Sequence, residues 1–551
     1  MKFPAILVSL GLLSLAAHGQ ATQTPTTGTG APGSGAPSWM PPESDFREVV
    51  LDEDQVVNGQ PTDTIIDPME IAVAKDGRVF WAERKGVVKM WLPATKTTSV
   101  IANIPVFDGL EEGMLGITLD PNFLKNGWIY LNHSLVETTN EGPEPHYRQG
   151  SKGKTGKIRV SRYTLTGDAL DIASEKTIIE VPVQREQCCH VGGSLTFDAK
   201  GNLYMSIGDN SNPFDSDGYS PSDPRPGHYP WDAQRSAANS DALAGKILRV
   251  KPRAEGGYDI PAGNLFKPGT PKTRPEIYVM GNRNCFRIAV DQKTGYLYWG
   301  EVGPDAGNND PKRGPAGHDE INQARVAGYF GWPYFVGDNK PYAKTDFVAR
   351  QVHQDAVAAR EKVKKENAQA KKEGKPEAEL PPAPAPWPAA DFTPEFYDPA
   401  HPVNDSPNNT GIRDLPPAMP AFIWYPPSPS AKFPVLGSGG RTAMAGPVYY
   451  FDPNLKSDRK LPKEFDHTLF IYEWSRNWII AVKLDEKDNI AKDANGKLMM
   501  ARFMPNTRIQ RPMDMELGPD GCLYVIEYGK EWGNNKDTKI LRLEHTPAAV
   551  N

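Results

Sequence analysis

A histidine that follows two adjacent cysteines is the side chain of this sequence best placed for chemistry. Cys188 and Cys189 precede His190, and the glycines Gly192 and Gly193 follow it. A neutral imidazole accepts a proton from an alcohol at ordinary pH, and two small residues let a ligand approach the backbone. The spacing therefore indicates a general base at the entrance to a strand. A structural histidine beside glycines is the open alternative.

The four cysteines permit three complete disulfide pairings, so the sequence leaves their connectivity open. Adjacent Cys188 and Cys189 fall outside ordinary disulfide geometry, and free buried thiols are as consistent with the sequence as a vicinal disulfide. If the pair is oxidised, we expect a flat, rigid sulfur surface beside His190 that could face a planar ligand.

Composition favours a turn-rich β-protein with one large folded domain. The 551 residues include 53 prolines and 50 glycines, among many short apolar runs. The net charge is −6, which provides no basic field for phosphates. The sequence also lacks a stripe of aromatic and basic side chains. Nucleic acid is therefore not an expected partner.

The first residues have the order of a secretory signal, with a charged start, a short apolar run and small residues. We expect a cleaved signal peptide over 1–19, a flexible leader rich in Thr, Gly, Pro and Ser over 20–44, and a folded domain over 45–548. The apolar run is too short to cross a bilayer, and no other stretch approaches the necessary length. These features predict a periplasmic or secreted protein without a membrane span.

A pattern of strand, turn and strand recurs along the folded domain. In each copy an apolar strand leads through a turn with Asp, Gly or Asn to a second apolar and aromatic strand. The copies cover residues 71–83, 116–131, 195–209, 288–301, 448–472 and 515–527. Because further strands follow several copies, the pattern predicts an all-β, six-bladed β-propeller with long loops between blades. Such loops gather on one face, where functional side chains converge.

One segment, residues 346–416, does not fit this repeat. Residues 355–379 are rich in Ala, Lys and Glu and predict a helix, whereas the proline-rich run 381–388 favours an extended chain. We interpret residues 355–388 of this segment as an exposed insertion between blades, outside the core. Its mixed charges are most simply a solvated helical face.

Loop motifs then appear in one order along the chain, as Leu-Gly, His-x-Gly-Gly, Gly-x-Arg-Asn, Gly-Pro-Asp, Asp-Glu-Ile-Asn and Gly-Trp-Pro. In this order the sequence resembles the soluble quinoprotein glucose and sorbosone dehydrogenase family, which includes aldose sugar dehydrogenases. The resemblance extends from about Asp67 to Leu543. It implies a six-bladed propeller that binds pyrroloquinoline quinone (PQQ) over its central mouth, assisted by a calcium ion (Ca2+).

The resemblance also implies roles for single residues. His190 would take the proton of the sugar C1 hydroxyl, while Arg283 and Asn284 would contact the quinone oxygens and stabilise negative charge there. Gly303 and Pro304 would form a calcium-binding turn through their backbone carbonyls, which are the hard oxygen ligands that calcium prefers.

A residue that contacts the sugar in the family has its counterpart in Glu111. This acidic residue could alter specificity, and a turn carboxylate is the alternative interpretation.

The last blades depart from the family pattern. The family has two arginines near this point, whereas Met513 replaces the second here and only Arg511 remains. The family's cofactor-binding lysine falls close to Ser475. Recognition of the quinone carboxylates therefore calls for other cations. Arg476 and Arg441 are candidates, because arginine grips carboxylates in a bidentate fashion.

The sequence thus predicts an exported oxidoreductase that oxidises an aldose-type sugar to its lactone. Electrons would pass to an external acceptor such as a cytochrome c, because the chain has no Cys-x-x-Cys-His haem motif. Two alternatives stay open. One is a calcium-dependent lactonase or related hydrolase on the same architecture, and the other is a carbohydrate-binding propeller without catalysis.

Overall fold

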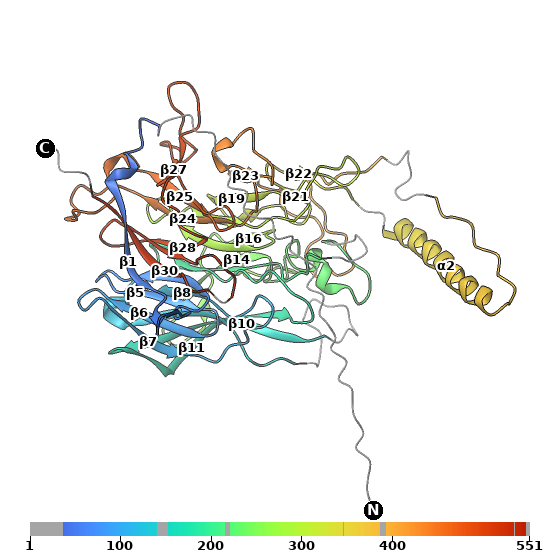
Figure 1. Ribbon diagram of the computed structural model, residues 1–551, viewed down its shortest axis with the longest axis horizontal. Coiled ribbons are helices and arrows are strands. Elements are labelled where there is room, and N and C mark those ends of the chain that lie inside the picture. Colours follow the sequence, from blue (N-terminus) through green and yellow to red (C-terminus); the bar gives the residue numbers. More distant parts are fainter. Residues whose placement is uncertain are drawn as a thin grey trace, which may run out of the picture.

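The computed structural model describes residues 37–139, 153–214, 221–344, 347–385, 393–533 and 535–546. Its large sheets are arranged as the six blades of a β-propeller, so the predicted fold is confirmed (Figure 1). Each of the six predicted hairpins supplies the first two strands of one blade. The predicted signal peptide, residues 1–19, lies outside the described residues.

Five blades take their strands in chain order from the inside outwards. Blade one has β4 (Pro68–Val73), β5 (Val79–Glu83), β6 (Val87–Leu92) and β7 (Thr97–Asn103). Blade two has β8 (Met114–Leu119), β9 (Trp128–Ser134), β10 (Thr155–Thr166) and β11 (Ala169–Gln184). Blade three has β12 (Leu195–Phe197), β13 (Leu203–Ile207), β14 (Lys246–Pro252) and β16 (Ile277–Met280), and β20 (Gly328–Tyr329) extends it in parallel. Blade four has β17 (Cys285–Val290), β18 (Leu297–Glu301), β19 (Asp319–Ala324) and β23 (Ile423–Tyr425). Blade five has β24 (Ala443–Tyr449), β25 (Thr468–Glu473), β26 (Trp478–Lys483) and β27 (Met500–Phe503).

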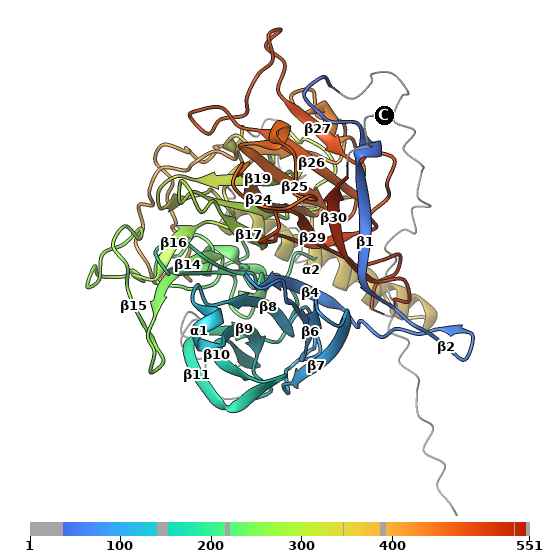
Figure 2. The ribbon, with the colours of Figure 1, turned by 90° about the vertical axis from the view of Figure 1, so that its left-hand side faces the viewer.

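The sixth blade joins the two ends of the folded domain. Its strands β28 (Pro512–Leu517), β29 (Leu523–Glu527) and β30 (Lys539–His545) come from the end of the chain, and the outer strand β1 (Phe46–Glu53) comes from the beginning. β1 runs antiparallel to β30, with Phe46 opposite His545, and the two strands lie side by side in Figure 2. This pairing closes the ring.

The end of the predicted leader is not flexible. Trp39 and Met40 pack against the main hydrophobic core, and the Glu43 carboxylate accepts a hydrogen bond from the Thr507 amide at 2.7 Å. An indole ring and a thioether bury enough apolar area to dock this short stretch. The expectation of a flexible leader over 20–44 is therefore wrong for residues 37–44, and residues 20–36 lie outside the described residues.

The insertion begins with a helix, as predicted, but it lies within a blade. α2 (Phe347–Lys372) falls between β19 and β23, the third and fourth strands of blade four, and not between two blades. The hairpin repeat located only the first two strands of each blade, so this position could not be predicted from it. In Figure 1, α2 stands apart from the sheets. No helix of the described ranges is long and apolar enough to cross a membrane.

The second part of the insertion returns to the propeller. The Tyr397 ring stacks on Tyr334 with centroids 4.1 Å apart, and the buried Asn404 amide donates to the carbonyl oxygen of Gln234 at 2.8 Å. These contacts lie within the predicted insertion 346–416 but beyond residues 355–388, the stretch expected to lie outside the core.

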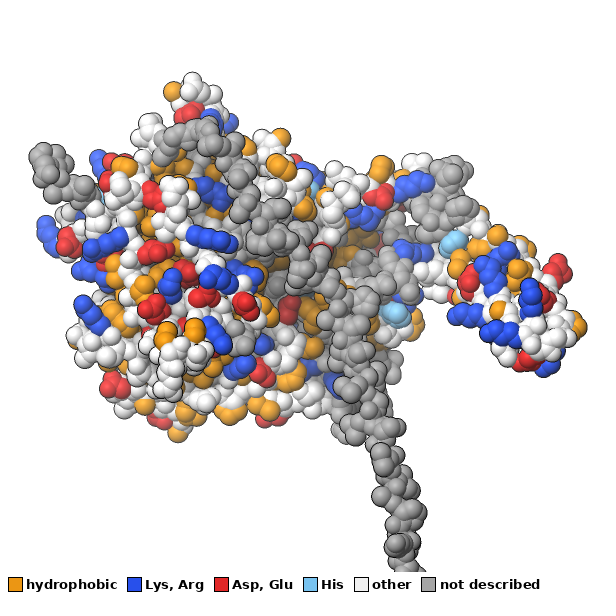
Figure 3. Space-filling view, in the orientation of Figure 1, with side chains coloured by type: hydrophobic (Ala, Val, Ile, Leu, Met, Phe, Trp, Pro, Cys, Tyr) orange, Lys and Arg blue, Asp and Glu red, His pale blue; other side chains and the backbone are white. Residues whose placement is uncertain are grey.

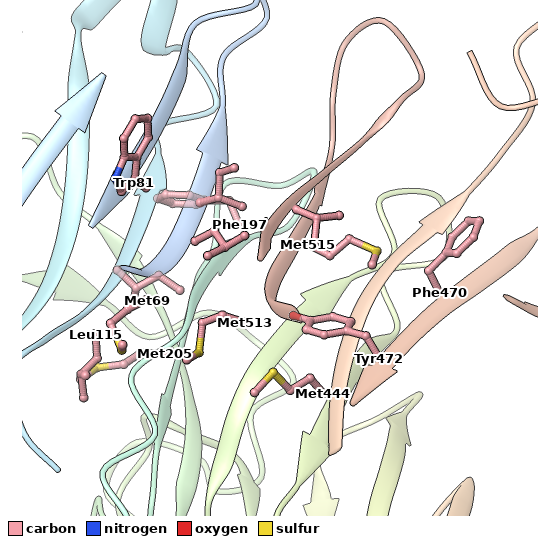
Figure 4. Packing of buried hydrophobic residues seen from close by; sticks show 14 of the residues in the cluster. Met69, Trp81, Leu115, Phe197, Met205, Met444, Phe470, Tyr472, Met513 and Met515 are labelled. Carbon is pink, nitrogen blue, oxygen red and sulfur yellow. The ribbon is translucent and has the colours of Figure 1, made fainter. Parts of the chain in front are cut away.

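Apolar side chains from several inner strands pack close together in the propeller core. Figure 4 shows this packing, which involves Met69, Leu115, Met205, Met444 and Met513. The core therefore includes flexible thioether side chains, which fill irregular space well.

A buried ionic cluster also links the inner strands of different blades. The Arg287 guanidinium of blade four donates to the carbonyl oxygens of Met69 and Met513 and lies 3.6 Å from the Asp514 carboxylate. Glu70 of blade one accepts the Ile117 amide at 2.7 Å. These contacts tie blades one, two, four and six together.

Candidate functional site

The strand register brings the predicted site residues to one end of the propeller. Cys285 pairs with Glu301 and Pro512 pairs with Glu527, so the start of each first strand lies beside the end of each second strand. The segments that enter first strands and the loops that leave second strands therefore share one face, which we call the mouth. His190, Arg283, Arg441 and Arg511 all lie in segments that enter first strands.

His190 is buried at the mouth and paired with Asp209, which follows β13. The distance between His190 Nδ1 and Asp209 Oδ1 is 2.8 Å. The other carboxylate oxygen of Asp209 accepts the indole N–H of Trp332 at 2.7 Å, and Ser211 donates its amide and hydroxyl to Oδ1. Asp209 is therefore fixed from three directions.

This environment favours an ionised Asp209. Burial by itself raises the pKa of this carboxyl, but the charge and hydrogen bond of His190, followed by Arg283 and Ser211, hold the pKa below its ordinary value. An ionised Asp209 accepts the Nδ1 proton and so fixes the imidazole tautomer. Nε2 of His190 has no hydrogen-bond partner among the described residues. It is thus the nitrogen available to accept a proton.

The backbone of His190 is constrained as well. Its φ is +60°, a left-handed backbone conformation that residues other than glycine rarely adopt. The Glu111 carboxylate accepts the His190 amide at 2.7 Å, and the Asn210 amide donates to the His190 carbonyl at 3.0 Å. A Cβ atom on Gly208 would lie 2.3 Å from that carbonyl oxygen, so this loop needs glycine there.

Glu111, expected to contact the sugar, therefore lies directly beside His190. The contact that the structure shows is with the backbone of His190. Its role toward a substrate stays a prediction.

Arg283 and Asn284 lie in a loop fastened to the His190 loop. The Asp209 amide donates to the Arg283 carbonyl at 2.7 Å, and the Gly192 amide donates to Oδ1 of Asn284 at 3.1 Å. One oxygen of Glu301 accepts the amides of both Arg283 and Asn284 at 2.6 Å. Movement of one loop therefore displaces the other.

The Arg283 side chain faces a small pocket and keeps part of its donor capacity. Its Nη1 donates to the Val302 carbonyl at 2.9 Å, and its guanidinium lies 5.9 Å from the Trp332 ring centre. The pocket lining includes Gly303, Pro304 and His318. Nε and Nη2 of Arg283 have no hydrogen-bond acceptor in the part of the chain that the structure describes.

The structure joins Cys188 and Cys189 in a disulfide, immediately before His190. Cys189 is buried, and its amide donates to the Ser211 carbonyl at 3.3 Å. Cys285 and Cys522 are free, buried thiols. Of the pairings left open by the sequence, the structure therefore contains the vicinal one.

The arginines proposed for the cofactor carboxylates separate into two kinds. Arg476 does not fit that role, because its guanidinium donates to backbone carbonyls, those of Pro426, Leu436, Gly437, Gly439 and Gly440. Arg441 is also engaged, as described below. Arg511 differs, because its Nη1 is buried without a hydrogen-bond partner among the described residues. The Arg511 guanidinium lies 4.5 Å from the Trp474 ring centre.

The turn expected to bind calcium is occupied by an arginine side chain. Nη2 of Arg441 donates to the Pro304 carbonyl at 2.8 Å, and Nη1 donates to Asp319 at 3.2 Å. Calcium would need that carbonyl oxygen as a ligand, beside a fixed positive charge. The residues at Gly303 and Pro304 therefore do not fit a calcium ion in this structure. Within the described ranges, no group of three or more His, Cys, Asp or Glu could hold a metal ion.

Sequence reasoning missed Asp209, Glu301 and Trp332 as site residues. A signal for the acids was present, because the second strands of several hairpins end in an acidic residue, such as Glu83, Glu301 and Glu527. In blade four this acid fixes the loop that carries Arg283. The repeat itself could have revealed this function.

The fold and the mouth define a class, that of six-bladed propellers with sugar dehydrogenase-type loop motifs. Residues 65–365 match the family model described as "Glucose / Sorbosone dehydrogenase". Because this match covers more than half of the chain, the chain belongs to that family.

Two curated relatives and one solved structure illustrate the relationship. Aldose sugar dehydrogenase YliI of Escherichia coli (strain K12) is 26% identical over 273 residues, which is 48% of this chain and 60% of that protein. Quinoprotein glucose dehydrogenase B of Acinetobacter calcoaceticus is 23% identical over 476 residues, or 83% of this chain and 82% of that protein. The structure of a putative oxidoreductase (glucose dehydrogenase) from Thermus thermophilus shares the fold, with a TM-score of 0.52 and 19% identity over 90% of this chain and 99% of that chain. The chain spans about three fifths of the length of the first curated relatives it matches.

Proposed function

We propose that this chain is a PQQ-dependent sugar dehydrogenase that oxidises the C1 hydroxyl of an aldose to the lactone and delivers the electrons to an external acceptor. The family supports an oxidoreductase of this type. The observation that carries the proposal is the connection between the two loops at the mouth. A histidine with an available Nε2 lies on one loop, and an arginine with unused N–H groups lies on the adjoining loop.

PQQ would supply a planar quinone that accepts hydride when it is bound. The donors of this chain fit such an anionic, planar group. Arg283 has unused N–H groups at a pocket, and Arg511 has a buried Nη1 without an acceptor among the described residues. Burial lowers the pKa of Arg511, so an anionic partner would stabilise its charged form.

The residues of the chain divide the remaining work. Nε2 of His190 takes the hydroxyl proton, and ionised Asp209 stabilises the imidazolium that forms. Glu111 holds the His190 backbone, while Glu301 holds the Arg283 loop. The Cys188–Cys189 disulfide lies next to the base, where its sulfur surface would face a planar ligand.

Titration of the purified apoprotein with PQQ, followed by dye reduction with a panel of aldoses, tests this proposal. We expect saturable binding and sugar-dependent reduction. Binding of sugars without turnover would support the carbohydrate-binding alternative. Hydrolysis of lactones without PQQ would support the hydrolase alternative.

We also propose export to the periplasm or the medium. The signal-like start of the sequence and a disulfide beside the base support an oxidising compartment. An external acceptor, such as a cytochrome c, would then meet the mouth in that compartment. Cell fractionation with an antibody to the chain tests this, and the full-length chain found only in the cytosol would contradict it.

A further inference from the structure

The loop that leaves blade four is built around Arg441, which comes from blade five. The Arg441 side chain is only 6% exposed. Its guanidinium donates to the Pro304 carbonyl at 2.8 Å and to Oδ1 of Asp319 at 3.2 Å, and it lies 3.7 Å from the Asp305 carboxylate. One buried cation thus binds a carbonyl oxygen and a buried carboxylate and lies near the exposed Asp305 carboxylate, all of them oxygens of the kind that bind metal ions.

The backbone around this cation has little room to change. The Gly303 amide donates to Asp319 at 3.0 Å, and a Cβ atom on Gly303 would lie 1.8 Å from the His318 carbonyl oxygen. A Cβ atom on Gly317 would lie 1.6 Å from the Pro304 carbonyl oxygen. The packing therefore fixes the Pro304 carbonyl in the direction of Arg441.

Arg441 is also the counterion of a buried carboxylate. Asp319 is fully buried, and the Arg441 guanidinium lies 3.2 Å from its carboxylate. Its second oxygen accepts the Ala443 amide at 2.9 Å. If Arg441 left the turn to admit a divalent ion, Asp319 would lose its partner. If Arg441 stayed, the ion would meet a like charge in a poorly solvated place.

We propose that the Arg441 guanidinium is the fixed cation of the Gly303-Pro304 turn and takes the place of a calcium ion there. The proposal rests on the function proposed above, and it adds that the cofactor binds without calcium. A covalently attached cation is positioned before the ligand arrives and cannot be removed by a chelator. The pocket beside the turn is lined by Arg283, Gly303 and Pro304, so the charge lies next to the predicted quinone site.

The first arm of the test measures PQQ affinity of the parent protein by fluorescence, in EDTA and in excess calcium. We expect equal affinities. Loss of PQQ binding in EDTA alone would overturn the inference while leaving the proposed function in place.

The second arm measures thermal unfolding of the apoprotein and does not depend on PQQ. In Arg441→Ser, the Pro304 carbonyl and Asp319 lose their cation and become available to calcium. We expect calcium to raise the Tm of this variant, and to leave the parent and Arg441→Lys unchanged. PQQ affinity of Arg441→Ser should also rise with calcium, by about 5- to 150-fold, the usual range of coupling between two ligands.

The matched control is Arg413→Ser, which also frees two carboxylates, Asp405 and Asp414, but on an exposed loop. A calcium response of Arg441→Ser no larger than that of Arg413→Ser would overturn the inference. If PQQ binds in neither buffer, the proposed function fails, and the Tm arm still decides the role of Arg441.

Discussion

At the scale of single residues, the mouth contains side chains that hold backbone and side chains that keep a reactive nitrogen available. Glu111 and Glu301 accept backbone amides, and Arg476 donates to carbonyls. His190, Arg283 and Arg511 each keep nitrogen atoms without a partner in the described part of the chain. The second group is the one in which substitutions should change chemistry more than stability.

Replacement of His190 should remove the base. We expect His190→Gln to keep its fold and its bound PQQ and to lower turnover by about 100-fold or more, the usual scale for a lost general base. Steady-state dye reduction, with a deuterium isotope effect at sugar C1 to show that chemistry limits the rate, measures this.

His467→Gln is the matched control, because His467 pairs with Asp488 at 2.8 Å but lies immediately before β25, away from the mouth. It should retain parental turnover. Parental turnover in folded, PQQ-loaded His190→Gln would remove the base assignment and favour the non-catalytic alternative.

Replacement of either arginine with unused donors should weaken cofactor binding. We expect Arg283→Ala and Arg511→Ala to weaken the binding free energy of PQQ by more than they lower the free energy of unfolding. The reason is that each guanidinium has few partners within the described chain. Fluorescence titration and thermal unfolding give the two quantities. Arg249→Ala serves as the control, since Arg249 also stacks on an aromatic ring, 4.5 Å from the centre of Tyr278, but lies within β14. Parental affinity in both mouth variants would refute this site.

The Asp209 carboxyl should make stability depend on pH in acid. Its pKa is lower in the folded protein than the ordinary value of 3.8, so its stabilising effect is complete above 3.8 and is lost as pH falls through the folded-state pKa. We expect Asp209→Asn to be less stable than the parent near neutral pH by about 1–3 kcal/mol, the usual cost of unpaired buried groups. The Tm difference should shrink below pH 3.8. A difference that stays constant throughout the acid range would contradict this assignment.

At the scale of elements, the hairpins form blades and the insertion leaves from one of them. Backbone hydrogen bonds join the segments on either side of α2. The Lys344 amide donates to the Glu395 carbonyl at 2.6 Å, and Ala343 forms an isolated antiparallel β-bridge with Phe396. The helix and its proline-rich continuation thus depart from, and return to, a single point.

Removal of residues 345–392, with a short flexible linker in their place, should leave a cooperatively folded protein. A longer deletion through residue 416 should destabilise it, since Asp232 would lose the Asn408 amide, which donates to it at 2.8 Å, and Tyr334 would lose Tyr397. Calorimetry of the two variants measures the difference. Aggregation of the shorter deletion would show that α2 supports the core.

At the scale of the whole molecule, the six blades follow from local signals. Turns such as Asp76-Gly77 and Asp520-Gly521, whose glycines have φ of +87° and +77°, are visible in a few residues. Contacts between blades are not visible in this way, because Arg441 meets Asp319, and Arg287 meets Asp514, only after their blades have packed together. The sequence therefore predicted the blades and the mouth, while the partners of its arginines depended on distant strands.

The distribution of charged side chains on the surface is consistent with the small net charge of the sequence. On the face shown in Figure 3, basic and acidic side chains are interspersed, and α2 carries both signs. Such a surface provides no extended field to steer a highly charged partner.

The pairing of β1 with β30 has a consequence for biosynthesis. The ribosome makes β1 first among the blade strands and β30 last, so β1 has no partner until synthesis is nearly complete. Contacts between such distant segments form slowly, and an unpaired strand edge invites association with other chains. A nascent chain that stops before Lys539 would lack only β30, but β29 and β1 would then both keep open edges. We expect such truncated chains to be prone to aggregation and to depend on chaperones.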